Sequence, residues 1–273
     1  MNARGGFPYT VFPRIPGRDF AGTVVAGPRS GEEVFGTSGY THAFTTNGFH
    51  AEYCVVSEDA VALKPKNVTF AQAACLGVPL TTASLALQRA AVEPSDCVSV
   101  IGASGSVGSY VVQLAQSMGC RVLRAARQSP TDVCIAEDEE FSALTSLTQG
   151  RGVDVVIDTV GMPALMKAAA EKLAHGGRMA VISARYGAEL AIHLKDFYRN
   201  EKSLVGCNTL SHSAPKLAKE LAAMSQALEK GDITPEDEKV WTKFSLGQAA
   251  EAYRKSEEGS GKYVLVMEEH CKV

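Results

Sequence analysis

The sequence predicts an α/β protein with a doubly wound parallel sheet and a second part that is rich in β-strands. Short strand-like segments separated by Gly and Pro fill the first 80 residues, and strands alternate with helices from Cys97 onward. A Gly-rich turn follows the first buried strand of that alternating region, as in doubly wound folds. A chain of 273 residues that is 45% hydrophobic is long enough for two domains.

The first 80 residues contain four segments rich in Val, Phe and Tyr: FAGTVVAG, EEVFG, HAEYCVV and AVALK. Turns such as GPRSG and TTNG lie between them, which is typical of short antiparallel strands. Residues 67–90 are instead rich in Ala and Leu and predict a helix. Asn67 or Thr69 is the expected N-cap, and Gly77–Pro79 should break the helix into two pieces.

From Cys97 the chain reads as repeated strand and helix units. CVSVIGA is a continuous apolar run, as expected of a parallel strand covered on both faces. The helix that follows ends at Gly119, and another, PALMKAAAEKLAHGG, starts with Pro and ends with Gly. The other buried strands expected are RVLRAA, DVVIDTV, GRMAVIS and SLVGCN.

The C-terminal segment predicts an amphipathic helix, KLAKELAAMSQALEKG, then an Ala-rich helix and a final strand, KYVLVME. These elements cannot complete the parallel sheet, so we expect them to join the N-terminal β-rich part. The predicted domains are therefore residues 81–210 for the sheet, and residues 1–80 with 211–273 for the β-rich domain.

Charge and cysteine usage narrow the class of protein. A formal net charge of -3 argues against a nucleic-acid partner or a polybasic membrane surface. The seven cysteines are scattered and form no C-x-x-C pair, which favours reduced thiols in the cytoplasm. The N-terminus lacks the apolar core of a signal peptide, and no run of 18 apolar residues occurs. We expect a soluble cytoplasmic protein.

The Gly-rich turn places Gly102, Gly105 and Gly108 at the spacing G-x-x-G-x-x-G. Glycines let a backbone turn tightly against a pyrophosphate, and the N-terminus of the following helix offers free N–H groups and a positive dipole. The spacing alone also occurs in ordinary loops. A strand before the turn and a helix after it favour dinucleotide binding.

The end of the next strand, Leu123 to Ser129, contains no carboxylate that could hold the ribose 2′-hydroxyl of NAD. Arg127 with Ser129 would suit a 2′-phosphate, which predicts NADPH as the cofactor. The alternative is that Arg124 and Arg127 are solvated surface charges.

Several motifs resemble the quinone oxidoreductase branch of the medium-chain dehydrogenase/reductase family, and they keep their order over nearly the whole chain. PGRDFAG at 16–22 resembles the family's P-G-x-D-x-A-G, and GFHAEYCVV at 48–56 is similar to its G-x-x-A-E-Y-x-x-V. TTASLAL at 81–87, the Gly-rich turn with its helix at 102–119, and GKYVLV at 261–266 match further family segments.

The resemblance implies a GroES-like β-rich substrate domain built from both chain ends, and a Rossmann domain between them. It implies NADPH, a homodimer, and hydride transfer to quinones or α,β-unsaturated carbonyls. Carried over residue by residue, Thr82 would touch the nicotinamide side of the cofactor. The pyrophosphate would lie on Ser104, Gly105, Ser106, Val107 and Gly108. The ribose and the nicotinamide would be lined by Val160, Gly161, Ser183 and Asn208.

No zinc is expected. Zinc-dependent relatives need a Cys, a His-Glu pair and a second Cys, whereas here His50 is followed by Ala51 and no Cys precedes residue 54. His42 and His50 are expected to be polar loop residues. Without a metal the site must orient the cofactor and polarise the acceptor oxygen, and Tyr9, Tyr40 or water could donate the proton. A structural role is the alternative for each tyrosine.

The sequence departs from the family in two places. It begins close to the P-G-x-D motif, so strands of the β-rich domain are expected to be missing. Only Gln128 to Thr131 separate RVLRAAR from DVCIAED, and four residues should not suffice for a parallel crossover, which normally contains a helix. Either DVCIAED is not a neighbouring parallel strand, or this side of the sheet is rebuilt.

These departures leave three functions open. The first is a zinc-independent, NADPH-dependent reductase of quinones or activated alkenes, and the second is an enoyl-thioester reductase of the same superfamily. The third is a weak or inactive isoform that keeps dinucleotide or partner binding. SLVGCN is expected to be an edge strand, and antiparallel pairing of two such edges would make a dimer.

Overall fold

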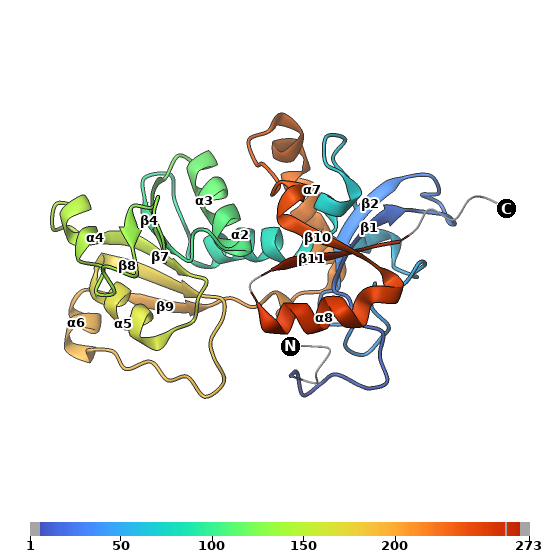
Figure 1. The fold of residues 1–273 in the computed structure, drawn as a ribbon. Helices are drawn as coiled ribbons and strands as arrows, with labels where there is room; N and C mark the ends of the chain where they lie inside the picture. The colour runs from blue at the N-terminus through green and yellow to red at the C-terminus, as the bar shows by residue number, and fades with distance from the viewer. Residues whose placement is uncertain (1–5, 260, 268–273) are drawn as a thin grey trace. The chain divides into compact units, whose positions relative to one another are not determined.

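The structure is a computed structural model that describes residues 6–259 and 261–267. The chain divides into two compact units (Figure 1). The terminal unit is residues 1–81 with 209–273, and the central unit is residues 82–208.

The central unit contains a sheet of six parallel strands in the order β6-β5-β4-β7-β8-β9. Its strands are β4 (Cys97–Ile101), β5 (Arg121–Ala126), β6 (Val133–Cys134), β7 (Val153–Asp158), β8 (Leu173–Val181) and β9 (Ser203–Gly206). The order runs outward from β4 in both directions, as in a Rossmann sheet. The predicted doubly wound α/β class is confirmed.

Helices cover both faces of this sheet (Figure 1). They are α2 (Gly77–Arg89), which spans the boundary between the units, α3 (Ser106–Ser117), α4 (Ser142–Leu147), α5 (Pro163–Glu171) and α6 (Leu194–Arg199). Helix α3 packs on β4 and β5, and α5 packs on β7 and β8 on the opposite face. Phe141 and Leu144 are fully buried in the core of that second face, together with Ile101 and Val156. The core therefore forms where apolar strand residues meet the two helix layers.

The connection from β5 to β6 corrects one expectation. The two strands are parallel neighbours, with Ala125 opposite Val133 and Ala126 opposite Cys134, although no helix joins them. The chain turns back at once, and the N–H of Asp132 donates to the carbonyl of Arg124 over 3.0 Å. Because β6 has only two residues, the return path is short and a crossover helix is unnecessary. The segment DVCIAED therefore does contain a neighbouring parallel strand, and this side of the sheet is rebuilt without a crossover helix.

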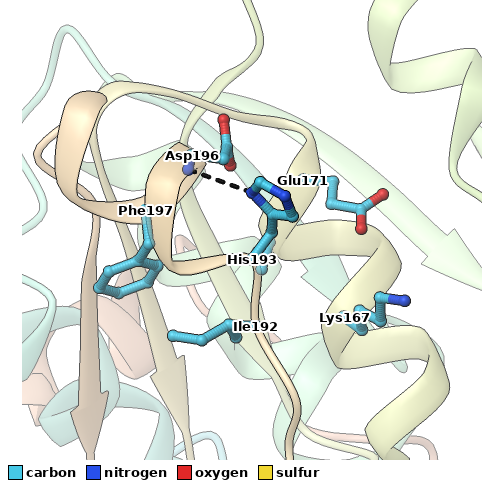
Figure 2. Close-up of a pocket in the computed structure, with 7 residues that line it drawn as sticks. Lys167, Glu171, Ile192, His193, Asp196 and Phe197 are labelled. Atoms are coloured by element: carbon cyan, nitrogen blue, oxygen red, sulfur yellow. Dashed lines mark hydrogen bonds between the residues drawn. The ribbon is translucent and has the colours of Figure 1, made fainter.

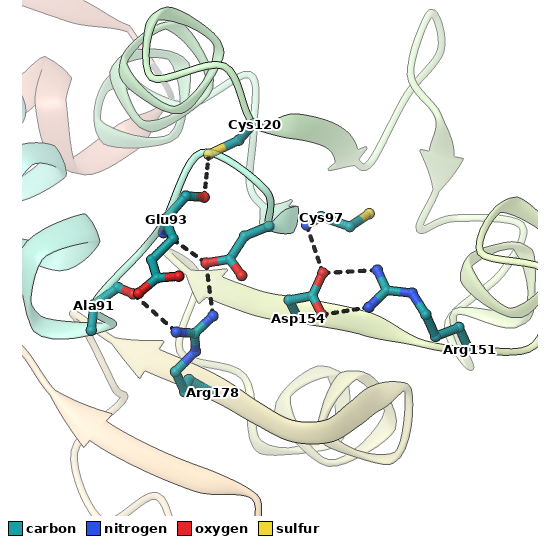
Figure 3. Close-up of polar contacts among 8 residues, drawn as sticks. Ala91, Glu93, Cys97, Cys120, Arg151, Asp154 and Arg178 are labelled. Atoms are coloured by element: carbon teal, nitrogen blue, oxygen red, sulfur yellow. Dashed lines mark hydrogen bonds and ion pairs between the residues drawn. The ribbon is translucent and has the colours of Figure 1, made fainter.

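Polar contacts tie together the ends of the strands where the chain enters the sheet (Figure 3). The carboxylate of Asp154 accepts the backbone N–H of Cys97 over 2.8 Å and holds both terminal nitrogens of Arg151 at 2.6 and 2.8 Å. Arg178 donates to Asp96 over 2.7 Å. These pairs link β4, β7 and β8 near their N-terminal ends, whereas the Gly-rich turn lies at the C-terminal end of β4.

The described residues of the terminal unit form two small sheets and several helices. Its strands are β1 (Asp19–Thr23), β2 (Glu33–Thr37), β3 (Ala62–Leu63), β10 (Trp241–Ser245) and β11 (Lys262–Val266). Strands β1 to β3 pair antiparallel, and β10 pairs parallel with β11. Its helices are α1 (Phe70–Ala73), α7 (Ala214–Lys230) and α8 (Ala249–Glu258), with short 3-10 turns at 58–60, 209–211, 238–240 and 246–248. Helix α7 packs against β2 and β3, so both chain ends build one core.

Local signals explain the helix ends of this unit. Thr69 caps α1 in a capping box with Gln72, as predicted. Asn67, the other candidate, instead donates to the carbonyl of Leu228 over 2.9 Å near the end of α7. Helix α7 ends at Gly231, whose φ of 80° is the left-handed conformation that glycine adopts readily.

The prediction of a strand at residues 50–56 is wrong. These residues form no strand, and Tyr53 and Val55 are 67% and 93% exposed. The segment is held by single contacts, such as that between His42 Nε2 and the carbonyl of Val55 at 3.3 Å. Its apolar side chains suit a strand, but among the described residues no neighbouring strand pairs with it, and pairing is what makes a strand.

Candidate nucleotide-binding site

The Gly-rich turn lies where β4 ends and α3 begins, and close contacts require glycine at two of its positions, Gly102 and Gly108. Gly102 has a φ of 81°, and a Cβ there would lie 2.4 Å from Thr159 Oγ1. Gly108 lies in the first turn of α3, where a Cβ would be 2.1 Å from the carbonyl oxygen of Gly102. The helix therefore starts directly against the turn, as close approach to a pyrophosphate requires.

The first turn of α3 offers free donors. Gly105 is the N-cap and brings no side-chain acceptor to the helix start. The N–H of Ser109 is the first to bond back to Gly105, at 2.9 Å, and within the described residues the amides of Ser106, Val107 and Gly108 have no backbone acceptor. Ser104 and Gly105 are exposed. A 12-residue helix with free amides and a positive end is suited to a diphosphate.

Asp158, at the end of β7, was not singled out from the sequence. Its buried carboxylate accepts the N–H of Val160 over 3.0 Å and that of Gly161 over 3.1 Å. Burial raises the pKa of this carboxyl, and the two amides oppose that effect. The sequence signal that could have identified this residue is the polar pair Asp158-Thr159 at the end of a buried strand. Asp158 fixes the turn that carries Val160.

This turn lies beside the Gly-rich turn and the end of β8. The methyl of Val160 would be 2.9 Å from a Cβ on Gly102, and a Cβ on Gly161 would be 2.4 Å from the carbonyl of Ser183. Asn208 follows β9, whose pairing with β8 continues through the N–H of Cys207 to the carbonyl of Val181 at 2.9 Å. Three adjacent parallel strands, β7, β8 and β9, thus end on the same side of the sheet as the Gly-rich turn. The residues that follow them there are Val160, Gly161, Ser183 and Asn208.

The two candidate arginines near the end of β5 differ in their contacts. Arg124 donates from Nε to Asp132 over 3.3 Å, and Asp132 also accepts the backbone N–H of Arg124 over 2.7 Å. Arg127 is exposed, and among the described residues its guanidinium has no hydrogen bond or ion pair. Ser129 is exposed in the same turn. Arg127 is therefore the arginine available to an anionic ligand at this end of the sheet.

The other candidates lie apart from these turns along the chain. Thr82 is buried in α2. Tyr9 and Tyr40 belong to the terminal unit and are 42% and 49% exposed. The phenol of Tyr9 packs on Phe44 with ring centroids 5.2 Å apart.

A hollow in the central unit lies away from the Gly-rich turn and from the turns after β7, β8 and β9. Figure 2 shows residues that line it, among them Lys167 and Glu171 of α5, and His193 and Asp196 at the start of α6. His193 Nδ1 accepts the N–H of Asp196 over 3.3 Å, so the imidazole is used as a helix cap. Because α5 runs back from the end of β7 to the start of β8, this hollow lies near the opposite edge of the sheet.

The described residues do not fit a zinc site. Across residues 6–259 and 261–267, no group of three or more His, Cys, Asp or Glu side chains comes close enough to hold a metal ion. His42 contacts Thr41 and Val55, and the Nδ1 of His50 lies 3.3 Å from the hydroxyl of Tyr253. Burial lowers the pKa of His50. Cys271 lies outside the described residues.

Comparison with known proteins places the chain in a family. Residues 106–225 match the model of the zinc-binding dehydrogenase domain. A zinc-type alcohol dehydrogenase-like protein of Schizosaccharomyces pombe is 44% identical over 272 residues, which cover 98% of this chain and 83% of that protein. This chain belongs to the medium-chain dehydrogenase/reductase superfamily.

Other members of the superfamily are more distant. The human quinone oxidoreductase is 28% identical over 92% of this chain and 78% of its own length. The crystal structure of an alcohol dehydrogenase superfamily protein from Novosphingobium aromaticivorans matches with a TM-score of 0.81 and 26% identity, covering 95% of this chain and 84% of that one. The chain is thus an oxidoreductase of this superfamily by descent. The fold is shared further with Escherichia coli YhdH, solved with bound NADPH, at a TM-score of 0.71 and 23% identity over 97% of this chain and 86% of that one.

Within the part of the chain that the structure describes, no helix is both long and apolar enough to span a membrane.

Proposed function

We propose that this chain is an NADPH-dependent, zinc-independent oxidoreductase that transfers hydride to quinones or α,β-unsaturated carbonyl compounds. The observation that carries the NADPH assignment is the end of β5, where Arg127 has an unpaired guanidinium among the described residues and no carboxylate occupies the position that would hold a 2′-hydroxyl. The quinone assignment is supported by the relatives named quinone oxidoreductase.

The residues of the central unit fit a nicotinamide dinucleotide. The amides at the start of α3 would hold the pyrophosphate, and Arg127 with Ser129 would hold the 2′-phosphate. The turns after β7, β8 and β9 would line the ribose and the nicotinamide, and Thr82 would touch the nicotinamide side. When bound, the reduced dinucleotide supplies the hydride. The protein then has to orient the acceptor, exclude water and polarise the acceptor oxygen.

The cofactor is tested by titrating the protein with NADPH and NADH and following nicotinamide fluorescence. We expect Arg127→Ala to weaken NADPH binding by roughly 10-fold or more, the usual range for losing a hydrogen bond to a charged group, and to leave NADH binding unchanged. Arg124→Ala is the matched control, because that guanidinium is already paired with Asp132.

Two outcomes of this titration would contradict the proposal. If wild type binds neither dinucleotide, the oxidoreductase assignment fails, and an isoform without the activity remains. If NADH binds as tightly as NADPH and Arg127→Ala has no effect, the cofactor assignment fails. Where NADPH binds, quinones, enones and enoyl thioesters are compared as substrates by the loss of NADPH absorbance.

Zinc-independence is tested separately. We expect the rate with the best acceptor to survive dialysis against a chelator and to gain nothing from added Zn²⁺, because the described residues offer no ligand set for the ion. Loss of activity on chelation with recovery on zinc addition would contradict this part of the proposal.

We also propose a homodimer formed through β9. This strand is the outer strand of the sheet next to β8, and Leu204 on it is 46% exposed. Two such edges could pair antiparallel and satisfy their free backbone groups. Leu204→Lys should shift the protein to a monomer in analytical ultracentrifugation, and a wild-type protein that sediments as a monomer would exclude the dimer.

A further inference from the structure

A loop of the central unit, residues 127–132, joins β5 to β6 without regular secondary structure. Its C-terminal end is fixed to β5. The N–H of Asp132 donates to the carbonyl of Arg124 over 3.0 Å, and the hydroxyl of Thr131 donates to the same carbonyl over 2.6 Å. Residues 127–130, which precede these contacts, are all exposed. The loop is therefore anchored at its base and accessible from solvent at its tip.

Ser129 lies in the exposed part of this loop, and among the described residues its hydroxyl has no hydrogen-bond partner. Pro130 follows it directly. A serine that precedes a proline is the residue that proline-directed protein kinases phosphorylate. Thr131 is the other hydroxyl of the loop, but it is only partly exposed and its hydroxyl is used by the carbonyl of Arg124. Ser129 is thus the hydroxyl of this loop that a kinase can reach.

A cation lies beside Ser129. Arg127 precedes it by two residues, so their Cα atoms are at most about 7 Å apart, which the long arginine side chain can bridge. Arg127 is exposed, and its guanidinium has no ion pair among the described residues, whereas Arg124 is held by Asp132 over 3.3 Å. Arginine binds phosphate through charge-assisted hydrogen bonds, often two at once. A phosphate on Ser129 would therefore take Arg127 as its partner.

The same arginine belongs to the proposed cofactor site. The N–H groups of Gly102 and Ala103 donate to the carbonyl of Ala125 over 2.9 and 3.1 Å, so the Gly-rich turn is attached to β5 two residues before Arg127. Arg127 with Ser129 is the pair that we propose for the 2′-phosphate of NADPH. A phosphate esterified to Ser129 would thus compete with the cofactor for one guanidinium.

We propose that Ser129 is a phosphorylation site, and that phosphoserine at this position excludes NADPH by occupying Arg127 and repelling the 2′-phosphate. This inference rests on the proposed function and adds a regulation of that same site. Phosphoserine carries a charge of about -1.5 to -2 at pH 7, so it neutralises the one guanidinium and leaves negative charge over. NADH has a hydroxyl in place of the 2′-phosphate, and its binding should be largely spared.

The modification is a phosphoryl transfer from ATP held by the kinase. Ser129 Oγ forms a bond to the γ-phosphorus, while the bond between that phosphorus and the β,γ-bridging oxygen breaks. ADP leaves with the electron pair of the broken bond, and the hydroxyl proton passes to a carboxylate of the kinase and then to solvent. A phosphatase reverses the change with water, which returns serine and inorganic phosphate.

The experiment treats the purified full chain with a proline-directed protein kinase, Mg²⁺ and ATP, locates the phosphate by mass spectrometry, and titrates NADPH and NADH by nicotinamide fluorescence. We expect phosphate on Ser129 and a loss of NADPH affinity of about tenfold or more, the usual range for losing a hydrogen bond to a charged group. NADH affinity should change far less. Wild type treated with kinase but without ATP is the reference.

Two variants separate the parts of the proposal. Ser129→Ala is the matched control, and kinase treatment should leave its NADPH affinity at the value measured before treatment. In Arg127→Ala the same phosphorylation should weaken NADPH binding less than it does in wild type, because the guanidinium to be occupied is already gone. An equal loss in Arg127→Ala and wild type would contradict the role of Arg127.

Three outcomes would overturn the proposal. Phosphate that appears on other residues but not on Ser129 excludes the modification site. Phosphate on Ser129 with unchanged NADPH affinity, or with an equal loss for NADH, excludes its action on the 2′-phosphate. If untreated wild type binds neither dinucleotide, the proposed function itself fails and this regulation fails with it, so the untreated sample tells the two failures apart.

Discussion

Gly108 offers a direct test of how closely α3 approaches the Gly-rich turn. In an ordinary helix, replacing Gly by Ala stabilises the protein by about 1 kcal/mol, because Ala restricts the unfolded chain and favours the helix. At Gly108 the new Cβ would lie 2.1 Å from the carbonyl oxygen of Gly102. Both elements in contact are backbone, so no side-chain rotation relieves the overlap.

The two effects have opposite signs, and we expect the clash to dominate. Overpacking costs about 1–3 kcal/mol, and a contact with rigid backbone belongs at the upper end of that range. The net expectation for Gly108→Ala is a loss of about 1–2 kcal/mol. NADPH binding should also weaken by roughly tenfold or more, because relief of the clash moves the amides that would hold the pyrophosphate.

The assay is urea unfolding followed by circular dichroism, with an NADPH titration on the same samples. Gly22→Ala is the control, because a Cβ at Gly22 meets no atom within 4 Å and its φ is not in the left-handed region. Gly22→Ala should change neither quantity appreciably. If Gly108→Ala is as stable as wild type or more stable, and binds NADPH normally, the close approach of α3 to the turn is refuted.

Three further predictions concern stability. Gly77→Ala should lower the unfolding midpoint, because its Cβ would lie 2.6 Å from the buried Asp19 Oδ1, and an unchanged midpoint would refute that contact. Lys202→Met should cost about 1–2 kcal/mol, because the Lys202 side chain is 2% exposed and its ammonium donates to the carbonyl of Ala170 over 3.0 Å and to the partly exposed Asp196 carboxylate over 2.7 Å. Equal urea midpoints for wild type and Lys202→Met would contradict this. Asp154→Asn should cost about 1–2 kcal/mol at pH 7, a value reduced because its guanidinium partner is half-exposed. The pKa of Asp154 is lowered by that partner, so its contribution is present above the pKa of the unfolded chain and is lost as the pH falls through the folded value. The stability difference between wild type and Asp154→Asn should therefore shrink below about pH 4, and a constant difference down to pH 2 would refute the assignment.

Local patterns predicted the parallel strands well, because each carries its own burial signal. The segments at 97–101 and 153–158 are rich in Val and Ile, as expected of strands that are buried on both faces, and glycine spacing marks the turn between β4 and α3. The capping box at Thr69 likewise involves only the four residues from Thr69 to Gln72. In these places the interactions that decide the structure are close in sequence.

The parts that sequence reasoning missed depend on distant partners. The segment 50–56 has strand-like composition but no neighbouring strand among the described residues, and no local pattern reveals that. The route from β5 to β6 depended on β6 being two residues long, which is set by pairing with Ala125 and Ala126. For the candidate site, Asp158 acts through backbone amides two and three residues ahead. The pairing of Asp132 with Arg124, eight residues apart, follows from the turn between β5 and β6, which was not predicted.

The division of the chain into units has a consequence for synthesis on the ribosome. The central unit is continuous in sequence, so all of its strands have emerged once residue 208 leaves the exit tunnel. The terminal unit must wait for α7, which packs on β2 and β3, and for β10 and β11. At roughly 5–20 residues per second, the N-terminal strands spend on the order of ten seconds without their packing partners. The first 81 residues are thus the stretch of this chain with the longest exposure to chaperones and to aggregation.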